Sequence, residues 1–411
     1  MGQRLASGIA AREEDWRDAA QGRRSVAGRS PRPVVCFPFV NDALGGSHIS
    51  ALHLMRHLDR RRFEPLVVLH RTTGPVADVF RREGISFEPA PSEWVLSPGR
   101  RPHPLPMIKE MMAIGGFLRQ RGVAIVHTND GPTHCAWALP ARLVGAKVVW
   151  HHRRGPDARG LRYLAPWVAH DVVAVSRFAI PQRAPSALRR KCTVIRSPFD
   201  AGLAATDRGA CRRMLLDELG LASDVRVVAY VGNLVQRKRP LVFVDAISAL
   251  ARRSPSFPFI GLLFGEPLEP GIEAAVLARA AASGVADRIR LMGFRYPPER
   301  WLGACDALLV PAVDEPFGRT LIEAMLVGTL VIAADSGGNP EAIRHGETGV
   351  LVPPDDAAGF ADHLERLGHQ PDWARAIAVT AQAEALDRFG VDRHAEAIMG
   401  IYDRLLQRAA A

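Results

Sequence analysis

The chain has 411 residues, 47% of them hydrophobic, and a formal net charge of +10. This length exceeds what one ordinary hydrophobic core holds, so we expect two domains. The five cysteines are scattered and none forms a Cys-x-x-Cys pair, which argues against a disulfide framework or a zinc site and fits a reducing cytosol. No stretch approaches 18 consecutive apolar residues and no secretory leader is apparent, so neither a membrane span nor secretion is predicted.

Positive charge is concentrated in the first half of the chain. Residues 1–200 contain 31 Lys and Arg against 16 Asp and Glu, a net charge of +15, whereas residues 201–411 contain 22 against 27, a net of −5. The excess is either a solvated Arg-rich surface or a surface that meets an anionic acceptor or membrane. Nucleic acid is not expected as a partner, because no recognition motif accompanies the charge.

The elements alternate along the chain. Residues 1–30 are polar and basic without sustained periodicity, which predicts a disordered extension. From residue 33, apolar runs alternate with helical patterns, and this order predicts a parallel sheet covered by helices on both faces. The apolar runs of this first series are PVVCFPFV, EPLVVLH, VAIVHTN, AKVVWHH and HDVVAVS.

A second series of the same kind begins near KCTVIRSPFD. Its apolar runs include VRVVAYVG, FPFIGLLFG, IRLMGF, DALLVPA, TLVIAAD and TGVLVPP. Two such halves, joined near residues 195–200, predict a ligand cleft between two domains. A closing helix is predicted at RHAEAIMGIYDRLLQR from the helical spacing of its apolar residues. These residues are Ala395, Ile398, Ile401, Tyr402 and Leu405.

Gly45 and Gly46 follow the first predicted strand and precede a helical pattern in NDALGGSHISALHLM. Glycines at such a place let the backbone approach an anion at a helix N-terminus, whose partial positive charge favours phosphate. A tight turn between strand and helix explains the same residues, because the stretch is neither Gly-x-Gly-x-x-Gly nor a Walker motif. Both interpretations stay open.

A second candidate loop lies in YVGNLVQRKRP, where a predicted strand ends at Gly232. The cations Arg237, Lys238 and Arg239 precede a helix that begins near Pro240. Cations in a loop at the carboxyl end of a parallel strand point into a ligand crevice. There, an Arg fork and a Lys point charge would neutralise a diphosphate. A solvated loop is the alternative.

The stretch DEPFGRTLIEAM places Glu315 and Glu323 on either side of a helix start near Gly318. The N–H groups of Gly318, Arg319 and Thr320 suit a phosphate, and the carboxylates can accept hydrogen bonds from sugar hydroxyls. Glu323 lies among apolar residues, where a carboxylate needs a partner. The helix dipole or a buried Lys or Arg is the alternative to a ligand in that role.

These residues resemble the retaining GT-B glycosyltransferases of family 4. The shared features are the Glu-x7-Glu pair, the PFG after Glu315, the segment GGNPEAIRHGETGVLVPPDD and the loop from Gly232 to Lys238, all in family order and spacing. The closing RFGVDRHAEAIMGIYDRLL resembles the C-terminal helix that crosses back onto the first domain in that family. The resemblance covers roughly residues 33–408 and is looser in the first half.

The resemblance implies a nucleotide-sugar site in the second half. Glu323 would hold the ribose, Glu315 a hydroxyl of the transferred sugar, and Lys238 the pyrophosphate. Where the family has an arginine directly after the loop glycine, this chain has Asn233, so Arg237 would supply that charge.

Further contacts follow from the same resemblance. Gly293 and Phe294 would lie at the nucleobase pocket, Gly232 in the loop that binds the donor, and Gly45 and Gly46 near the donor phosphates. The amides that would contact the sugar and the pyrophosphate are those of Phe317, Gly318, Arg319 and Thr320.

A histidine of the family's first domain is expected after the strand in KVVWHHRR. His151 or His152 would bind the transferred sugar, and Arg153 is a third candidate for the equivalent position. An ordinary place at a strand end is the alternative for both histidines. Asn129, in HTND, is a candidate contact to the acceptor.

We therefore expect an α/β protein of the GT-B type, with two Rossmann-like domains facing each other across a cleft and a C-terminal helix crossing back to the first domain. The expected parts are a disordered basic extension at 1–30, an acceptor domain at 31–197, a donor domain at 198–388 and the crossover helix at 389–411.

The expected activity is transfer of a sugar, with retention of configuration, from a UDP- or GDP-linked donor to a glycan, lipid-linked or small-molecule acceptor in polysaccharide biosynthesis. No Asp-x-Asp occurs in the chain, so no metal cofactor is expected. A sugar-nucleotide epimerase of the same fold and a non-catalytic sugar-nucleotide-binding protein are the alternatives. The expected location is the cytoplasm, with peripheral contact to an anionic inner membrane face as a further hypothesis.

Overall fold

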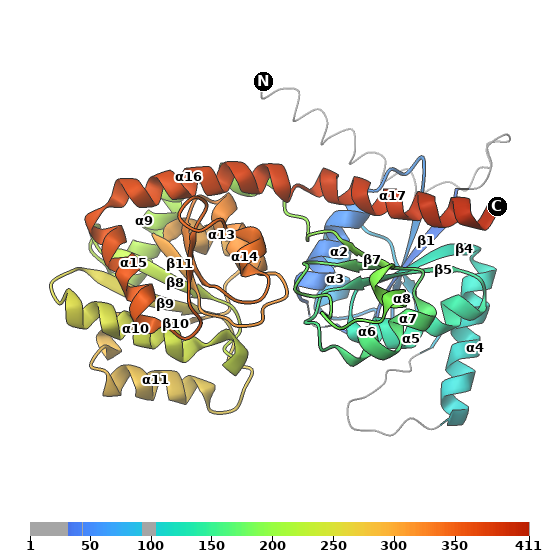
Figure 1. Cartoon of the computed structure of the whole chain (residues 1–411), viewed down its shortest axis with the longest axis horizontal. Helices are drawn as coiled ribbons and strands as arrows, with labels where there is room; N and C mark the ends of the chain where they lie inside the picture. Colours follow the sequence, from blue (N-terminus) through green and yellow to red (C-terminus); the bar gives the residue numbers. More distant parts are fainter. Residues whose placement is uncertain (1–31, 43, 93–103, 411) are drawn as a thin grey trace. The chain divides into compact units, whose positions relative to one another are not determined.

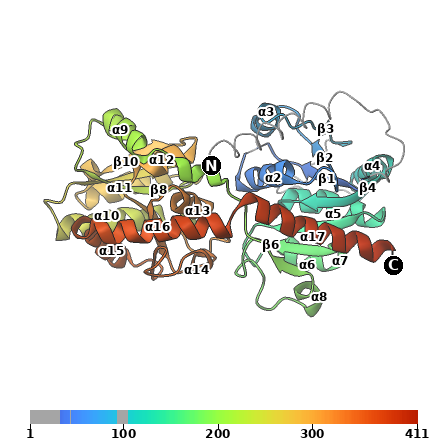
Figure 2. The same ribbon diagram turned by 90° about the horizontal axis from the view of Figure 1, so that it is seen from above.

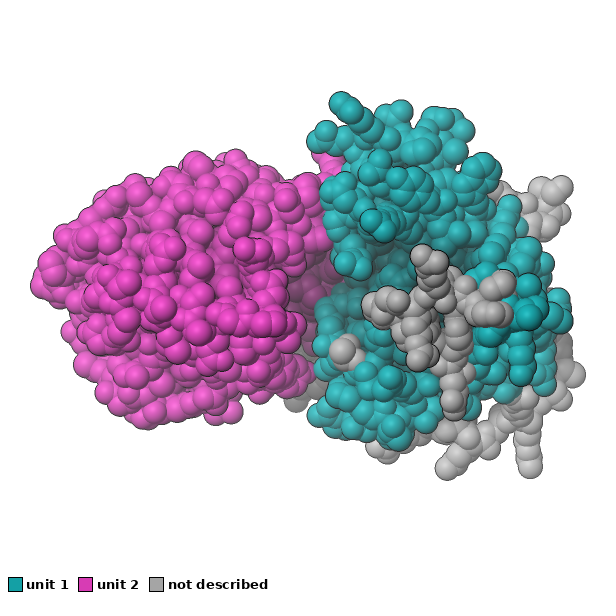
Figure 3. All heavy atoms as spheres, turned by 90° about the horizontal axis from the view of Figure 1, so that it is seen from below, with its two compact units in different colours: residues 1–174, 180–195, 395–411 teal, residues 175–179, 196–394 magenta. Residues whose placement is uncertain are grey.

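The computed structural model describes residues 32–42, 44–92 and 104–410 (Figure 1). The predicted extension at residues 1–30 lies outside the described residues. The chain divides into two compact units, shown in two colours in Figure 3. Unit 1 comprises residues 1–174, 180–195 and 395–411, and unit 2 comprises residues 175–179 and 196–394.

Unit 1 is built on a seven-stranded sheet in which every pair of neighbouring strands is parallel. The strand order is β3-β2-β1-β4-β5-β6-β7. The chain thus builds the sheet outwards from β1 in one direction and then from β4 in the other, which is a doubly wound arrangement. The strands are β1 (Val34–Phe39), β2 (Glu64–Leu69), β3 (Glu88–Pro89), β4 (Val123–Thr128), β5 (Lys147–His152), β6 (Asp171–Ala174) and β7 (Cys192–Val194).

Helices cover both faces of this sheet. One hydrophobic core joins the sheet to α2, α3 and α17, and a second joins the opposite face to α4 through α8. Burial on both faces explains why the strands are apolar along their length rather than alternating. The helices are α2 (Gly46–His57), α3 (Pro75–Arg82), α4 (Pro104–Gln120), α5 (Gly131–Leu143), α6 (Arg159–Tyr163), α7 (Ala165–Val168), α8 (Ser186–Arg189) and α17 (Val391–Ala410).

The C-terminal helix α17 belongs to the core of unit 1, although it begins only at Val391 and the last strand of that unit ends at Val194. Figures 1 and 2 show it as the long red helix that runs over the seven-stranded sheet. The apolar face predicted for it is confirmed, because all five residues are at most 5% exposed. These residues are Ala395, Ile398, Ile401, Tyr402 and Leu405.

Unit 2 contains a six-stranded parallel sheet in the order β10-β9-β8-β11-β12-β13. Here the chain starts in the middle at β8, adds β9 and β10 on one side, and then adds β11 to β13 on the other. The strands are β8 (Arg226–Val231), β9 (Phe259–Phe264), β10 (Ile289–Gly293), β11 (Ala307–Val310), β12 (Leu330–Ala334) and β13 (Val350–Val352).

The helices of unit 2 lie on both sides of its sheet (Figure 1). Helices α10, α11 and α15 share a core with one face, and Ala374 and Ile377 of α16 join that core. Helices α13 and α16 both contact β12. Asp207 and Asp356 cap α9 and α15 by accepting backbone N–H bonds from the first turn. The helices are η1 (Ala201–Ala205), α9 (Arg208–Leu219), η2 (Gln236–Lys238), α10 (Pro240–Arg253), α11 (Ile272–Ala282), η3 (Ala286–Arg288), α12 (Pro298–Ala304), α13 (Arg319–Leu326), α14 (Asn339–Ala342), α15 (Ala357–His369) and α16 (Pro371–Arg388).

The Glu341 carboxylate explains why residues 175–179 group with unit 2. It accepts N–H bonds from the backbone of Arg177 at 3.0 Å and of Phe178 at 2.9 Å, and it pairs with Arg196 at 3.4 Å. The division predicted at 197/198 and the observed one at 195/196 differ by two residues, and the segment 175–179 is a further difference.

Among the described residues, no helix combines the length and the apolar character that crossing a membrane requires.

Candidate functional site

The loops that carry the predicted donor residues follow β8 and β11, the two neighbouring strands at which unit 2 changes direction. In doubly wound sheets, ligands bind outside the carboxyl ends of the strands at this switch point. The loop after β8 carries Arg237 and Lys238 in the short helix η2, and the loop after β11 carries Glu315 just before α13. The sheet topology thus places the two predicted loops side by side.

Arg237 and Glu315 form an ion pair between these loops. Arg237 Nη1 lies 2.6 Å from Glu315 Oε2, and the Val313 N–H donates to the Arg237 carbonyl at 3.1 Å. The Glu315 side chain is 17% exposed and that of Arg237 is 45% exposed. A carboxylate and a guanidinium from separate loops therefore form an ion pair, and the arginine of this pair is half-exposed.

Close packing of glycines fixes the β8 loop. Gly232 has a φ of 148°, a conformation that glycine adopts readily and other residues rarely do. A Cβ on Gly265 would lie 2.1 Å from the Gly232 carbonyl oxygen, so the loops after β8 and β9 touch through their backbones. A Cβ on Gly232 would also meet the side chain of Lys238, which lies against this glycine. The loop glycine therefore makes room for the predicted lysine.

A second glycine pair positions Glu315. Gly337 has a φ of 62°, and a Cβ on it would lie 2.5 Å from the Glu315 carbonyl oxygen. A Cβ on Gly338 would lie 2.4 Å from the carbonyl oxygen of Pro316. The Gly338 N–H donates to the Glu315 carbonyl at 2.7 Å. Gly337 and Gly338 therefore pack directly against the backbone of the loop that carries Glu315.

Helix α13 begins directly after this loop. Gly318 is its N-cap and supplies no side-chain bond to the first turn. The first N–H groups of an α-helix have no partner within the helix, so the start of α13 suits an anion. The Phe317 side chain is buried against Phe199 and Phe389, so only its backbone is placed to contact a ligand. Thr320 lies in the first turn and is partly exposed.

Glu323 is 9% exposed, and its charge has a partner inside the protein. Arg319, one turn earlier in α13, lies 3.2 Å from Glu323 Oε1. The Arg319 guanidinium also donates to the Pro198 carbonyl at 3.3 Å and stacks over the Phe199 ring at 4.4 Å. Of the two explanations for a carboxylate among apolar residues, the arginine partner is present in the structure. A role in ribose binding stays a prediction.

Gly293 ends β10, which lies two strands from β8 in the sheet, and Phe294 follows directly. Gly293 has a φ of 65°, and its carbonyl accepts the Gly265 N–H at 2.9 Å. The Phe294 side chain is 63% exposed, so an aromatic face is available at this edge. Asn233 is exposed, and its carbonyl accepts the Tyr230 hydroxyl at 3.2 Å.

In unit 1, the predicted glycines lie at the start of α2. Gly45 is the N-cap with φ −144°, which is extended backbone that any residue adopts. A Cβ on Gly45 would meet only His48 Nδ1, at 4.0 Å. Neither the conformation nor the packing of the described residues therefore requires glycine at position 45. Gly46 is the first residue of the helix.

The two candidate histidines at the end of β5 have different surroundings. His151 is fully buried, and its Nδ1 lies 3.0 Å from His127 Nε2 and 3.3 Å from Arg153 Nη2. His152 is 2% exposed and its Nε2 donates to the Gly155 carbonyl at 3.1 Å. Burial lowers the pKa of His152 to about 4. Asn129 Oδ1 lies 3.5 Å from Arg153 Nη2, so Arg153, His151 and Asn129 form one group.

Sequence reasoning missed two members of this group. His127 in β4 contacts both His151 and, through Nδ1 at 2.5 Å, the hydroxyl of Tyr402 in α17. Tyr402 was predicted only as part of an apolar helix face. Its hydroxyl was the available signal, because a buried tyrosine usually places its O–H against a polar partner.

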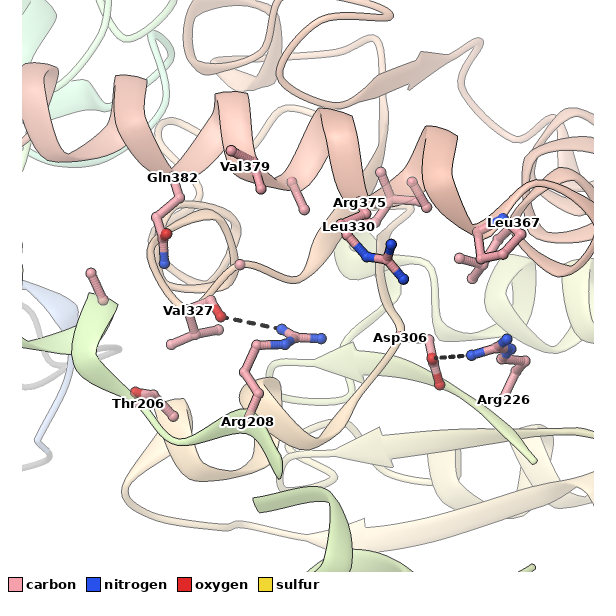
Figure 4. A pocket seen from close by; sticks show the side chains of 15 residues that line it. Thr206, Arg208, Arg226, Asp306, Val327, Leu330, Leu367, Arg375, Val379 and Gln382 are labelled. Carbon is pink, nitrogen blue, oxygen red and sulfur yellow. Dashed lines mark hydrogen bonds and ion pairs between the residues drawn. The ribbon is translucent and has the colours of Figure 1, made fainter. Parts of the chain in front are cut away.

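A hollow of about 410 Å³ lies at the amino ends of the strands of unit 2, away from the predicted residues, which follow the carboxyl ends (Figure 4). Arg226, which starts β8, pairs with Asp306 at 3.1 Å, and Arg208 donates to the Val327 carbonyl at 3.2 Å. Arg375 pairs with Asp372 at 2.7 Å. Because these cations are already engaged by carboxylates and carbonyls, we regard the hollow as a feature of the packing between α16 and the sheet.

Comparison with known proteins gives the fold directly. The crystal structure of HepE from Anabaena in complex with UDP and glucose superimposes with a TM-score of 0.74, at 21% identity over 90% of this chain and 99% of that one. A glycosyltransferase from Rickettsia africae gives a TM-score of 0.77 at 19% identity, over 92% and 99% of the chains. Two α/β units with parallel sheets, as in these proteins, constitute the GT-B fold, so the predicted fold class is confirmed.

Sequence similarity is concentrated in part of the chain. Residues 225–370 match the family model described as glycosyl transferases group 1. D-inositol 3-phosphate glycosyltransferase of Actinosynnema mirum is 36% identical over 206 residues, which are 48% of this chain and 47% of that protein. The enzyme of the same name from Nocardia farcinica is 37% identical over 205 residues. The chain spans about half the length of these relatives.

Proposed function

We propose that this protein is a retaining glycosyltransferase that moves a sugar from a UDP- or GDP-linked donor to an acceptor. The observation that carries the proposal is the ion pair of Arg237 and Glu315 at the switch point of unit 2, beside the start of α13. These residues fall within the segment that matches the group 1 model. The arrangement offers cations and helix amides for a diphosphate and a carboxylate for sugar hydroxyls.

In this proposal, unit 2 binds the donor. Lys238, Arg237 and the first-turn amides of α13 stabilise the negative charge that develops on the departing diphosphate, which is the step that most needs electrostatic help. Glu315 orients a hydroxyl of the transferred sugar. The Arg237 side chain is half-exposed, so its guanidinium can turn from Glu315 to a phosphate of the donor. The complexes of HepE with UDP and with UDP-glucose support a UDP-linked donor.

Glu323 is proposed to bind the ribose while keeping its bond to Arg319. A carboxylate has two oxygens and about four lone-pair sites, so one arginine does not exhaust it. The ion pair holds the carboxylate in place before the donor arrives. Exposed Phe294, at the end of β10, is proposed to stack on the nucleobase.

Unit 1 is proposed to bind the acceptor and to approach the donor phosphates with Gly45. Glycine is not required there by the packing of the described residues, since an added Cβ would meet only His48 Nδ1, at 4.0 Å. The acceptor is a glycan, a lipid-linked sugar or a small molecule. The proposed reaction uses no resident metal, so transfer should persist in the presence of a chelator.

The test begins with thermal unfolding of the protein in UDP, GDP and a panel of their sugar conjugates, because a bound ligand raises the unfolding temperature by mass action. The donor that binds is then incubated with acceptor mixtures, products are detected by mass spectrometry, and NMR identifies their anomeric configuration and any epimerised donor. A transferred sugar with unchanged anomeric configuration supports the proposal. Isomerised donor without transfer would instead identify an epimerase, and binding without any turnover a non-catalytic protein.

A further inference from the structure

A line of buried hydrogen bonds runs from the C-terminal helix to the carboxyl end of β5. The Tyr402 hydroxyl lies 2.5 Å from His127 Nδ1, His127 Nε2 lies 3.0 Å from His151 Nδ1, and Arg153 Nη2 lies 3.3 Å from the same His151 nitrogen. Tyr402, His127 and His151 are all 0% exposed. The line joins residues that are up to 275 positions apart in the chain.

The direction of every hydrogen bond in this line follows from Arg153. A guanidinium carries only N–H donors, so His151 Nδ1 must accept and must therefore lack a proton. His127 Nε2 contacts that same acceptor, so it must carry a proton and donate. A neutral imidazole with Nε2 protonated accepts at Nδ1, so the Tyr402 hydroxyl donates to His127. Arg153 at one end of the line and the Tyr402 hydroxyl at the other thus favour the same Nε2–H tautomer in both histidines.

Burial excludes water from the side chains of Tyr402, His127 and His151. Burial also raises the pKa of Tyr402 well above its ordinary value, so its hydroxyl keeps the proton that it donates. With both imidazoles neutral, this assignment of the protons satisfies all three contacts.

We propose that Tyr402 and His127 are positioning residues that hold His151 as the Nε2–H tautomer, with Nδ1 directed at Arg153, and thereby fix the Arg153 guanidinium for an anionic group of the substrate. This inference rests on the proposed glycosyl transfer. Arg153 Nη2 is held between His151 Nδ1 and Asn129 Oδ1 at the carboxyl ends of β5 and β4, neighbouring strands of the unit 1 sheet. Ligands of doubly wound sheets bind at this edge.

The proposal gives the C-terminal helix a second task. Its apolar residues anchor α17 to the sheet of unit 1. Tyr402 also connects α17 to Arg153 through the hydrogen-bonded side chains of His127 and His151. A merely structural role would make Tyr402 matter for stability alone, so the test must separate stability from the state of the histidines and from catalysis.

The first arm measures tautomers and does not depend on activity. In full-length protein with 15N-labelled histidine, two-bond N–H correlations distinguish Nε2–H from Nδ1–H rings. We expect both His127 and His151 to be Nε2–H at neutral pH, assigned by comparison with His127→Gln and His151→Gln. In Tyr402→Phe, His127 loses the donor at Nδ1 and should lose its single tautomer. A native His151 with a protonated Nδ1 overturns the proposal.

The second arm measures turnover with the donor found by the screen described above. Tyr402→Phe keeps the ring and removes only the hydroxyl, and we expect kcat/KM to fall roughly tenfold, as for the loss of one buried hydrogen bond. Ile401→Val is the matched control, since Ile401 is buried in the same helix and takes no part in the line. It should lower the unfolding temperature and leave kcat/KM unchanged.

A conservative rescue completes the test. In His127→Gln the amide N–H₂ retains a donor near His151, whereas His127→Leu retains none. We expect His127→Gln to keep more activity than His127→Leu at equal stability. Equal losses in the two variants, or unchanged tautomers and turnover in Tyr402→Phe, would overturn the proposal and show that these side chains only pack the interior of unit 1. If the native protein shows no transfer at all, the proposed function fails, while the tautomer arm still decides the direction of the hydrogen bonds.

Discussion

The Arg237 guanidinium lies 2.6 Å from the Glu315 carboxylate, although 78 residues separate the two in the chain. They meet because β8 and β11 are neighbours in the sheet and each residue lies in the loop that follows its strand. In the absence of a ligand, each neutralises the other. In the proposed complex with a nucleotide-sugar, the donor would bind both side chains in place of their mutual ion pair.

This exchange predicts separable effects of the three charged residues. Lys238→Ala and Arg237→Ala should each weaken binding of UDP or GDP by about 10- to 150-fold, because a charge-assisted hydrogen bond is worth roughly 1.5–3 kcal/mol. Glu315→Gln should mainly lower kcat, because its proposed partner is the transferred sugar. Calorimetric titration with the nucleoside diphosphate and kinetics with the full donor measure the two effects. Unchanged nucleotide affinity in both cation variants would mean that this loop is merely solvated.

The support of Glu315 by Gly337 predicts a strong effect of one added methyl group. In Gly337→Ala the new Cβ would lie 2.5 Å from the Glu315 carbonyl oxygen, so the Glu315 loop must move. Gly346→Ala is the matched control, because Gly346 also has a positive φ, 79°, but nothing lies within 4 Å of its added Cβ. We expect a loss of about 1–2 kcal/mol for Gly346→Ala from the left-handed backbone alone, and a larger loss for Gly337→Ala. Chemical denaturation measures both, and equal losses would contradict the close packing seen at Gly337.

Glu323 should contribute to stability as well as to the proposed ribose site. Glu323→Gln leaves Arg319 largely buried without its carboxylate, which should cost roughly 1.5–3 kcal/mol of unfolding free energy. The exposed pair of Arg344 and Glu347, with side chains 52% and 65% exposed, is the control. Glu347→Gln should cost well under about 1 kcal/mol. Donor affinity should fall in Glu323→Gln only, and a fall in stability without a fall in affinity would leave Glu323 a purely structural residue.

Buried histidines predict that acid destabilises the protein. Burial lowers the pKa of His152, and likewise those of His70 and His170, to about 4, whereas an unfolded histidine has a pKa near 6.5. Below pH 6.5 the unfolded chain takes up protons that the folded protein does not, so the unfolding free energy is level above pH 6.5 and falls from there towards pH 4.

For His152 alone the loss would reach about 3 kcal/mol near pH 4. Urea denaturation at several pH values, compared between the native protein and His152→Asn, measures this contribution as a shallower slope in the variant. The exposed His369, replaced by Gln, is the control and should leave the slope unchanged. A slope that His152→Asn does not alter would show that His152 is not the group responsible.

The excess of +15 in residues 1–200 leads to a prediction about anionic membranes. Each basic residue near an anionic bilayer contributes about 1 kcal/mol, and screening shortens the reach of the charge from about 10 Å at 0.1 M salt to about 3 Å at 1 M. We expect cosedimentation with anionic but not with neutral vesicles, and loss of binding at high salt. Absence of binding, or binding that ignores salt, would favour the solvated surface and a small-molecule acceptor.

Several features were predictable from the sequence because they depend on neighbouring residues. Apolar runs separated by helical patterns gave the parallel α/β sheets, and the spacing of apolar residues after 394 gave the buried face of α17. The sequence also predicts that loops after strands carry Arg237, Lys238 and Glu315, because a loop begins where a strand pattern ends. Whether these residues bind a donor stays a prediction.

Other features depend on the order of the strands, which the local pattern does not specify. The pairing of Arg237 with Glu315 needs β8 beside β11, and the contact of Tyr402 with His127 needs α17 packed on the sheet of unit 1. Only the tertiary structure separates His151, which contacts Arg153, from His152, which bonds within its own loop. A local pattern fixes which side chains can reach an edge or a face, whereas a contact between distant residues exists only after every intervening element has packed.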